Sequence, residues 1–403
     1  MPSRCSRRSM LTATGTLGVA ALSGCLGSRT ADAGETAAYD WSTGGADARN
    51  SRAIPDGVAP RDDPTLEWAL EFDAYPVLAE PIVADEVVLL TTGRDVVAVD
   101  RETRERLWSV ESENGDRGVT YTSASTVVEG VAYVTDHGTL IAVDVESGKR
   151  EWKYEFDYPF VDHAPTYLDR TEHLYAAAGE YVRSFDPETG EVVWERQLQG
   201  IAHGSIVFNE TSLFPLVVAT QSGELYALDT SGRVRWRRQL PDWIRSTPTV
   251  VTSGDRLGGS GIVVGCRDGY VYCLDDTGRR EWRASTGTSP DGASAVAHDR
   301  VFVRDNETLY AFDADDGDES WRVDVGEGTR NPPIVVGDTV YVGGDRLYAI
   351  DVDGGIGVRE HRVRERRFAS DVDGTVTFVS AADGQLFVVV DLEDGEFELH
   401  VLS

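Results

Sequence analysis

Cysteine is scarce in this chain. Its 403 residues include four cysteines, of which only Cys266 and Cys273 lie beyond residue 25. These two have no histidine partner at a metal-binding spacing, so they do not match a zinc site. If Asp268 and Gly269 form the turn of a hairpin, Cys266 faces Val271, and the two cysteines are diagonal neighbours about 7–8 Å apart. That separation is near or beyond the reach of a disulfide, which favours two buried thiols.

Lysine is scarcer still, and positive charge is outnumbered by negative charge. Lys149 and Lys153 are the only lysines, and 38 basic side chains face 69 acidic ones, for a formal net charge of −31. This acidic, arginine-using composition resembles that of haloarchaeal proteins. Molar salt shortens the Debye length to about 3 Å and screens the repulsion between surface carboxylates. Because no net basic face is available, nucleic acid is not an expected partner.

Long apolar runs are absent too. The apolar stretch Leu11–Leu22 is well below the roughly 20 residues that a helix needs to span a bilayer. No later stretch is long and apolar enough to do so. A short apolar run at the N-terminus is typical of an export signal instead of a transmembrane anchor.

The flanks of this run carry two export signatures. Ser6-Arg7-Arg8-Ser9-Met10-Leu11 resembles a twin-arginine signal, and Leu22-Ser23-Gly24-Cys25 resembles a lipobox. We therefore expect residues 1–24 to be a signal peptide and residues 25–63 to be a tether and lead-in segment. Cys25 is expected to carry a lipid that anchors the exported protein to the outer face of the cytoplasmic membrane.

What the chain does contain is a repeat. In its clearest copy, the apolar run Leu140–Val143 ends at Asp144, a Glu-Ser-Gly turn follows, and Trp152 lies in the next strand. The repeated aspartates are 38 to 46 residues apart, at positions 100, 144, 186, 229, 275, 313, 351 and 391. The last two copies carry His361 and His400 where the tryptophan would fall. A period near 40 with several short strands per repeat predicts an all-β, eight-bladed β-propeller with one four-stranded blade per repeat.

Each position that recurs in the repeat has a structural role. The aspartate accepts backbone N–H bonds in an Asx-type turn, the glycine takes a positive φ, and the tryptophan is a large apolar side chain that fills space in the core. The pattern Ala-x-Asp-x-x-x-Gly-x-x-x-Trp resembles the repeat of the pyrroloquinoline quinone (PQQ)-type propellers. It is complete at Ala142/Asp144/Gly148/Trp152 and at Ala311/Asp313/Gly317/Trp321. The resemblance implies a propeller over residues 64–403, in a family that includes both quinoprotein dehydrogenases and non-catalytic scaffolds.

The two ends of this region are expected to close the ring. Thr65–Phe72 is a tryptophan-bearing strand that precedes the first full repeat. We expect it to pair with the last blade near Phe397–Val401, so that no sheet edge stays open. It can supply the fourth strand of that blade or an extra strand beside it.

The leading functional hypothesis is a non-catalytic, PQQ-like propeller that serves as a protein-interaction scaffold at the cell surface. In repeat, lipobox and size the chain is similar to the propeller lipoprotein of the bacterial outer-membrane barrel-assembly machine. The specific partner of that lipoprotein is not carried over. We expect a lipid-anchored monomer that binds an unknown protein partner at the outer face of the membrane.

Two other classes stay open, a PQQ-dependent quinoprotein-type oxidoreductase and a small-ligand sensor or carrier. Quinoprotein dehydrogenases hold calcium, use an aspartate base and in many cases contain a vicinal disulfide. This chain has no adjacent cysteines and little room for the insertions that cover the cofactor. We therefore predict no catalytic, cofactor-binding or metal-ligating residue, and neither PQQ nor calcium is an expected cofactor.

A ligand or partner site is predicted at one mouth of the central channel. The innermost strands of the eight blades can be aligned on one shared position, which is Asp371 in the eighth copy. Ala369 and Phe368 lie two and three residues before it. Just before this position, blades three to seven supply polar side chains, whereas the other blades supply apolar or small ones. The candidate residues are Asp162, His163, His203, Arg245, Asp291, Arg330 and Asn331. Arginine suits an anionic group, although a hydrated and internally paired ring is the alternative. Quinoprotein cofactors lie at the corresponding mouth.

Overall fold

The computed structural model describes most of residues 40–403. The gaps are residues 73–76, 78, 114–120, 122, 160, 162, 214, 253, 256–258, 291, 327–330, 359–360, 364–365 and 393–394. The expected signal peptide and Cys25 therefore lie outside the described residues. The described part falls within one compact unit, Thr36–Ser403. This part of the chain contains no helix long and apolar enough to cross a membrane.

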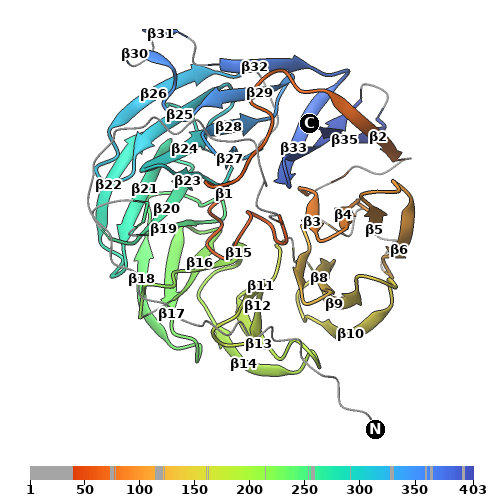
Figure 1. Ribbon diagram of the computed structural model, residues 1–403. Coiled ribbons are helices and arrows are strands. Elements are labelled where there is room, and N and C mark those ends of the chain that lie inside the picture. The colour runs from red at the N-terminus through yellow and green to blue at the C-terminus, as the bar shows by residue number, and fades with distance from the viewer. Residues whose placement is uncertain are drawn as a thin grey trace, which may run out of the picture. The chain divides into compact units, whose positions relative to one another are not determined.

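Eight antiparallel sheets are arranged as blades around a central axis, which confirms the predicted propeller (Figure 1). In blades one to four, from the innermost strand outward, the strands are β3 (Ile82–Ala84), β4 (Val87–Thr91), β5 (Asp95–Asp100) and β6 (Arg106–Glu111); β7 (Thr126–Val128), β8 (Val131–Asp136), β9 (Thr139–Asp144) and β10 (Arg150–Glu155); β11 (Thr166–Leu168), β12 (His173–Ala178), β13 (Tyr181–Phe185) and β14 (Val192–Gln197); and β15 (Ala202–Phe208), β16 (Leu216–Thr220), β17 (Glu224–Leu228) and β18 (Val234–Gln239).

Blades five to eight continue the ring. Their strands are β19 (Thr249–Val251), β20 (Gly261–Cys266), β21 (Tyr270–Asp275) and β22 (Arg280–Ser285); β23 (Ala295–Ala297), β24 (Arg300–Arg304), β25 (Thr308–Asp313) and β26 (Glu319–Asp324); β27 (Ile334–Val336), β28 (Thr339–Val342), β29 (Arg346–Asp351) and β32 (Arg366–Asp371); and β33 (Thr375–Ala382), β34 (Gln385–Asp391), β35 (Phe397–Leu402) and β2 (Leu66–Phe72). A separate hairpin, β30 (Ile356–Val358) and β31 (His361–Val363), is inserted before β32.

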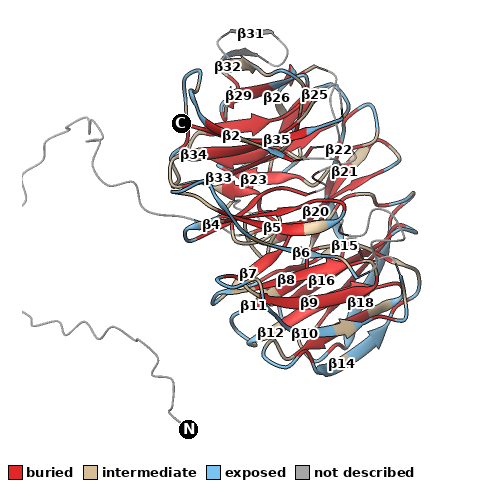
Figure 2. Ribbon diagram, turned by 90° about the vertical axis from the view of Figure 1, so that its right-hand side faces the viewer, coloured by how far each residue is buried: buried red, intermediate tan, exposed pale blue. Residues whose placement is uncertain are grey.

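Burial follows the position of each strand within its blade. The middle strands, such as β9 and β17, are buried along nearly their whole length because neighbouring blades cover both of their faces. The outermost strands, such as β14 and β18, are mostly exposed and rich in charge. Figure 2 shows this change from buried inner strands to exposed outer ones. Charged edges of this kind discourage pairing with other sheets.

Consecutive blades are joined by the tryptophan of one repeat and the turn of the next. The indole N–H of Trp152 donates to the carbonyl of Pro187 at 2.8 Å, one residue after the repeat aspartate of blade three. A Cβ atom on Gly190, in the same turn, would lie 2.6 Å from the indole. The equivalent indole bonds are Trp108–Val145, Trp194–Thr230, Trp236–Asp276, Trp282–Ala314 and Trp321–Val352. The recurring glycine and tryptophan therefore form one joint between neighbouring blades.

The eighth blade corrects the repeat assignment at the C-terminus. Asp391 ends β34, the second strand of the blade, and not a third strand like the other repeat aspartates. The third strand is β35, and its last hydrogen bonds link Ser403 with Thr65 at 2.9 and 3.1 Å. Ser403 thus takes the aspartate position. The spacing of 40 residues between Asp351 and Asp391 is coincidental, because the second strand of this blade also ends in an aspartate.

Strand β2 is the fourth strand of the eighth blade, which resolves the alternative left open by the sequence. Trp68 of β2 pairs with Val401, just as Trp108 pairs with Ala98 in blade one. His400 lies opposite Ala69 and Val388 and does not take the tryptophan position.

The seventh blade requires a second correction. His361 belongs to the inserted hairpin, and Phe368 of β32 pairs with Ala349 where Trp321 pairs with Ala311 one blade earlier. Asp371 therefore ends the outermost strand of blade seven. It does not lie in the innermost strand of blade eight, which is β33.

The cysteine hairpin also differs from its expected register. Cys266 pairs with Tyr270 instead of Val271, and Cys273 pairs with Val263, because the turn contains three residues. Both cysteines are buried, and neither belongs to a disulfide in the described chain. Burial raises the pKa of Cys266 to about 11, so this thiol is protonated at neutral pH.

Residues 41–54, which we call the plug, run through the centre of the ring (Figure 1). Trp41 exchanges two backbone hydrogen bonds with Val83 of blade one. Further carbonyl-to-amide bonds of 2.8–2.9 Å are Ser42–Val127, Ala48–Phe208, Arg49–Val250, Ser51–Val296 and Arg52–Val335. Strand β1 (Ala53–Ile54) then adds to β27 in parallel. The plug satisfies backbone groups that the innermost strands would otherwise present to the channel.

Candidate functional site

A cavity of about 270 Å³ opens at the predicted mouth, where the innermost strands begin. It brings together three of the predicted site residues, His163, His203 and Arg245, from blades three, four and five. Asn331 is buried elsewhere, and its side-chain amide donates to the carbonyl of Val376 at 2.8 Å, which ties blade seven to blade eight. The remaining predicted residues, Asp162, Asp291 and Arg330, lie outside the described residues.

The rings of His163 and His203 contact each other at the cavity. Their rings are 5.6 Å apart between centroids and nearly perpendicular. The backbone N–H of Gly204 donates to the ring of His163. Gly204 has φ +79, and a Cβ there would lie 2.8 Å from the Cα of Thr247, so the backbones of blades four and five meet closely at this point.

Part of the remaining lining is apolar. It contains Ala79 and Ala124 of the first two blades, Pro332 and Phe378. Phe378 belongs to β33 and is the aromatic side chain that blade eight contributes. The sequence alignment predicted Phe368 for this place, and the shift follows from the misassigned last repeat.

The floor of the cavity was missed by sequence reasoning. It is made by Gly44, Asn50 and Arg52 of the plug and by Glu80 of blade one. The only signal was the concentration of polar residues at positions 47–52, Asp-Ala-Arg-Asn-Ser-Arg, within a segment read as a lead-in. Nothing local in that stretch shows that it turns back into the channel.

Arg52 and Glu80 form a buried ion pair in this floor. Their side chains are only 6% and 8% exposed. Glu80 also accepts the backbone N–H of Gly45, and Arg52 Nε donates to the carbonyl of Pro333 at 3.3 Å. Each charge is thus neutralised and hydrogen-bonded, as a buried pair requires. The pair links the plug to blades one and seven.

The plug holds an unfavourable backbone conformation where it meets the cavity. Ala46, Asn50 and Arg52 have φ of 72°, 54° and 52°, a region that costs non-glycine residues about 1–3 kcal/mol each. Asn50 compensates by donating its amide to the carbonyl of Pro248 at 3.1 Å. Such strain persists only where surrounding contacts determine the backbone.

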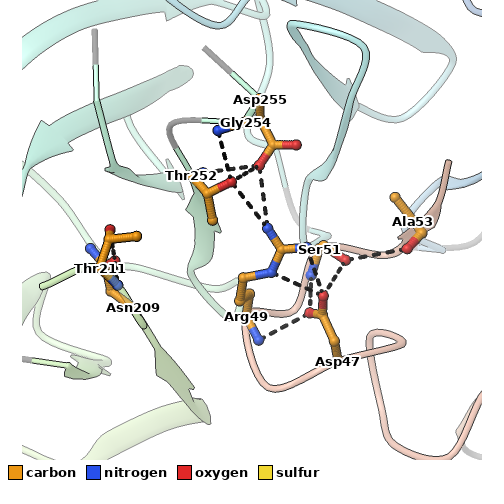
Figure 3. Close-up of polar contacts among 9 residues, drawn as sticks. All are labelled: Asp47, Arg49, Ser51, Ala53, Asn209, Thr211, Thr252, Gly254 and Asp255. Atoms are coloured by element: carbon orange, nitrogen blue, oxygen red, sulfur yellow. Dashed lines mark hydrogen bonds and ion pairs between the residues drawn. The ribbon is translucent and has the colours of Figure 1, made fainter. Parts of the chain in front are cut away.

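On the side of the plug away from the cavity, a second polar cluster fixes it to blade five. Arg49 lies between Asp47 and Asp255, at 3.0 and 3.3 Å (Figure 3). Asp47 also accepts the backbone N–H and the hydroxyl of Ser51 at 2.9 and 2.8 Å. The plug is therefore held by side chains on both of its sides.

The described lining does not fit a calcium-assisted quinone. Calcium takes six to eight oxygen ligands with carboxylates prominent among them. Glu80 is the only carboxylate among the described lining residues, and it is engaged by Arg52 and Gly45. No group of three histidine, cysteine, aspartate or glutamate residues in the described ranges is placed to hold a metal ion.

A ring of four-stranded repeats, joined by tryptophan–glycine contacts and open at one mouth, defines a PQQ-like eight-bladed β-propeller. The sequence model of the family described as outer membrane protein assembly factor BamB matches residues 60–170, 178–257 and 267–398. The chain belongs to this family.

Solved propellers share the architecture at low sequence identity. BamB from Moraxella catarrhalis is similar with a TM-score of 0.66 and 17% identity, covering 84% of this chain and 99% of that one. A quinohemoprotein alcohol dehydrogenase from Comamonas testosteroni is similar with a TM-score of 0.70 and 16% identity, covering 90% and 80%. A europium-containing methanol dehydrogenase gives 0.68 and 12%, covering 91% and 98%. At these identities the likeness concerns the fold alone.

A curated relative matches part of the chain. The serine/threonine-protein kinase AfsK of Streptomyces griseus is 27% identical over 182 residues, which are 43% of this chain and 22% of the kinase. The chain spans about a fifth of the length of this relative.

Proposed function

We propose that this protein is a non-catalytic propeller scaffold that binds a protein partner at the mouth of its channel. It is exported, anchored through a lipid on Cys25 to the outer face of the cytoplasmic membrane, and monomeric. The partner is a protein at that face.

The plug is the observation that carries this proposal. It bonds to the innermost strands of six blades and fills the centre of the ring. The mouth is therefore a preformed surface over a small cavity. A surface that needs little ordering on binding loses little conformational entropy, which suits repeated docking of a partner.

Family membership supports the same function. The family is described by a role in outer membrane protein assembly, which is a role exercised on other proteins. We transfer to this chain only the class of activity, which is protein interaction. The membrane and the partner of the relatives are not transferred.

The test is crosslinking in intact cells with a membrane-impermeant reagent, followed by purification of the lipoprotein and identification of its neighbours. One protein neighbour should be recovered in near-stoichiometric yield, and a variant with bulky substitutions at the mouth, Ser246→Trp with Thr247→Trp, should lose it. The same substitution on an outer strand, Val193→Trp, is the matched control and should retain it.

An enzymatic assay completes the test. The full chain is incubated with PQQ and calcium, and dye-linked oxidation of a panel of alcohols and sugars is measured. No turnover above the background of free PQQ is expected. Turnover that depends on the protein would overturn the scaffold proposal, as would crosslinking that yields the same neighbours from both mouth and control variants.

A further inference from the structure

Arg245 differs from the other arginines that the fold buries or half-buries. Seven such arginines have an anionic or carbonyl partner: Arg49 with Asp255, Arg52 with Glu80, Arg101 with Asp383, Arg183 with Glu195, Arg300 with Asp353, Arg304 with the carbonyl of Gly343, and Arg367 with Asp351. Arg245 is half-buried in the cavity lining and makes no hydrogen bond or ion pair within the described part of the chain. The chain contains 69 acidic residues, so a shortage of carboxylates does not explain why Arg245 lacks such a contact.

The surroundings of Arg245 are set up to receive an anion. Ser246 accepts the N–H of Gly265 at 3.2 Å, and Thr247 accepts the N–H of Ser205 at 3.3 Å, so each hydroxyl keeps its own hydrogen for donation. Both residues line the cavity together with Arg245. A partly desolvated guanidinium without a counter-charge is unfavourable, and a carboxylate that forms two parallel bonds with it removes that cost.

The same loop displays a tryptophan to solvent. Trp243 is 51% exposed and is the only exposed aromatic side chain among the described residues. The other tryptophans of the described part lie in the outermost strands of the blades or in the plug, where they are buried or half-buried.

Contacts with the hairpin of β20 and β21 fix the backbone of this loop. Its neighbour Ile244 is 1% exposed and bridges to Cys266. Arg267 donates its backbone N–H to the carbonyl of Trp243 at 2.9 Å and places its guanidinium 5.4 Å from the ring centre. An exposed tryptophan with a rigid backbone and an adjacent arginine has the composition of the energetic centre of a protein interface.

We propose that the blade-five loop Asp242–Thr247 is the docking site for a peptide segment of the partner protein. The segment places a carboxylate in the cavity against Arg245 and packs an apolar side chain on Trp243. This rests on the proposed scaffold function and names the surface and the partner chemistry that serve it. Because the body carries a net charge of −31, recognition relies on short-range paired hydrogen bonds and apolar contact, which salt screens far less than long-range attraction.

The experiment probes the full chain in detergent with a phage-displayed library of random dodecapeptides. Wild-type protein should select peptides in which aspartate or glutamate lies near a large apolar residue. Fluorescein-labelled copies of the selected peptides then give dissociation constants for variants whose melting temperatures match wild type. Arg245→Gln should weaken binding at least tenfold and remove the preference for acids, and Arg245→Lys should weaken it less.

Trp243→Ala should also weaken binding at least tenfold but leave the acid preference in place. Leu213→Ala is the control, since Leu213 is 84% exposed and lies in the loop after β15, at the far end of an innermost strand. Selected peptides that lack carboxylates, or unchanged affinity for Arg245→Gln, would overturn the proposal. So would Arg245-dependent binding to phosphatidylglycerol vesicles in place of peptides. If cellular crosslinking yields a partner but these variants keep it, the docking site is wrong while the scaffold function stands.

Discussion

Gly317 of blade six lies directly against the indole ring of Trp282 of blade five. A Cβ atom on Gly317 would be 2.6 Å from Cε3 of that ring, and the glycine has φ +76. The indole N–H of Trp282 donates to the carbonyl of Ala314 in the same turn at 3.1 Å. Two residues that belong to different copies of the repeat therefore meet, and neither can change alone.

Gly317→Ala is expected to lower the free energy of unfolding by about 2–4 kcal/mol. Part of this loss comes from the left-handed backbone and part from overpacking against the indole. The control is Gly130→Ala, since Gly130 has φ +81 but no atom within 4 Å of its would-be Cβ. That variant should lose only the backbone contribution, about 1 kcal/mol. Chemical denaturation at constant salt measures both, and equal losses would show that the indole contact does not matter.

Glu80→Gln should destabilise the propeller by about 3 kcal/mol, because it leaves the guanidinium of Arg52 buried without a counter-charge. Adding Arg52→Met should recover part of that loss, since both charges are then gone. Glu113→Gln is the surface comparison, because Glu113 pairs with Arg150 and Lys153 while half exposed and should change stability little. Unfolding curves of these three variants and of the wild type measure the changes. If the double variant is no more stable than Glu80→Gln, the two residues are not coupled.

Acid should destabilise the fold through the repeat aspartates. Burial alone would raise the pKa of Asp275, but hydrogen bonds from Thr277 and from the backbone N–H of Arg279 outweigh it and lower the pKa. A carboxyl group whose folded pKa is depressed stabilises the fold above its unfolded value, near 3.9, and loses that contribution as pH falls through the folded pKa. The melting temperature should therefore drop steeply below about pH 4, and Asp275→Asn should reduce the steepness.

Asp391 provides the opposite control. Its pKa is raised by burial, consistent with its place in a second strand instead of a repeat turn. Ionisation of Asp391 therefore opposes folding, and Asp391→Asn should stabilise the protein at neutral pH without removing the acid transition. A loss of stability at pH 7 in this variant would contradict the corrected repeat assignment.

Salt should stabilise the protein. With a net charge of −31, the folded chain repels itself at low ionic strength, and molar salt screens that repulsion. The melting temperature is expected to rise markedly between 0.1 and 2 M sodium chloride, while sorbitol at equal osmolality, which does not screen charge, should have a smaller effect. A melting temperature that is flat across this range would reject the interpretation of the acidic composition.

Cys25→Ser should release the protein from the membrane fraction, because it removes the proposed site of lipidation. Cys266→Ser is the matched control, since that thiol is buried in blade five, and it should leave the protein membrane-bound. Immunoblots of fractionated cells measure both. Unchanged fractionation of Cys25→Ser would reject the lipid anchor.

The blade number and the turn within each repeat could be predicted because their chemistry is local. In Asp144–Trp152 the turn carboxylate, the glycine and the tryptophan lie within one hairpin, so a single copy specifies its own shape. Repetition at about 40 residues then predicts the ring. The same reliance on spacing misplaced the last copy, since Asp391 falls at the right interval in the wrong strand.

By itself the sequence determined eight blades, the pairing of Thr65–Phe72 with the last blade and the end of the channel at which His163, His203 and Arg245 converge. These depend on turn chemistry and period, which short segments encode. Tertiary structure alone decided that residues 41–54 enter the channel, that Arg52 meets Glu80, that Phe378 and not Phe368 completes the mouth, and that Arg245 has no partner within the described chain. These depend on contacts between residues far apart in the chain, and no local pattern reports which distant groups the folded backbone brings together.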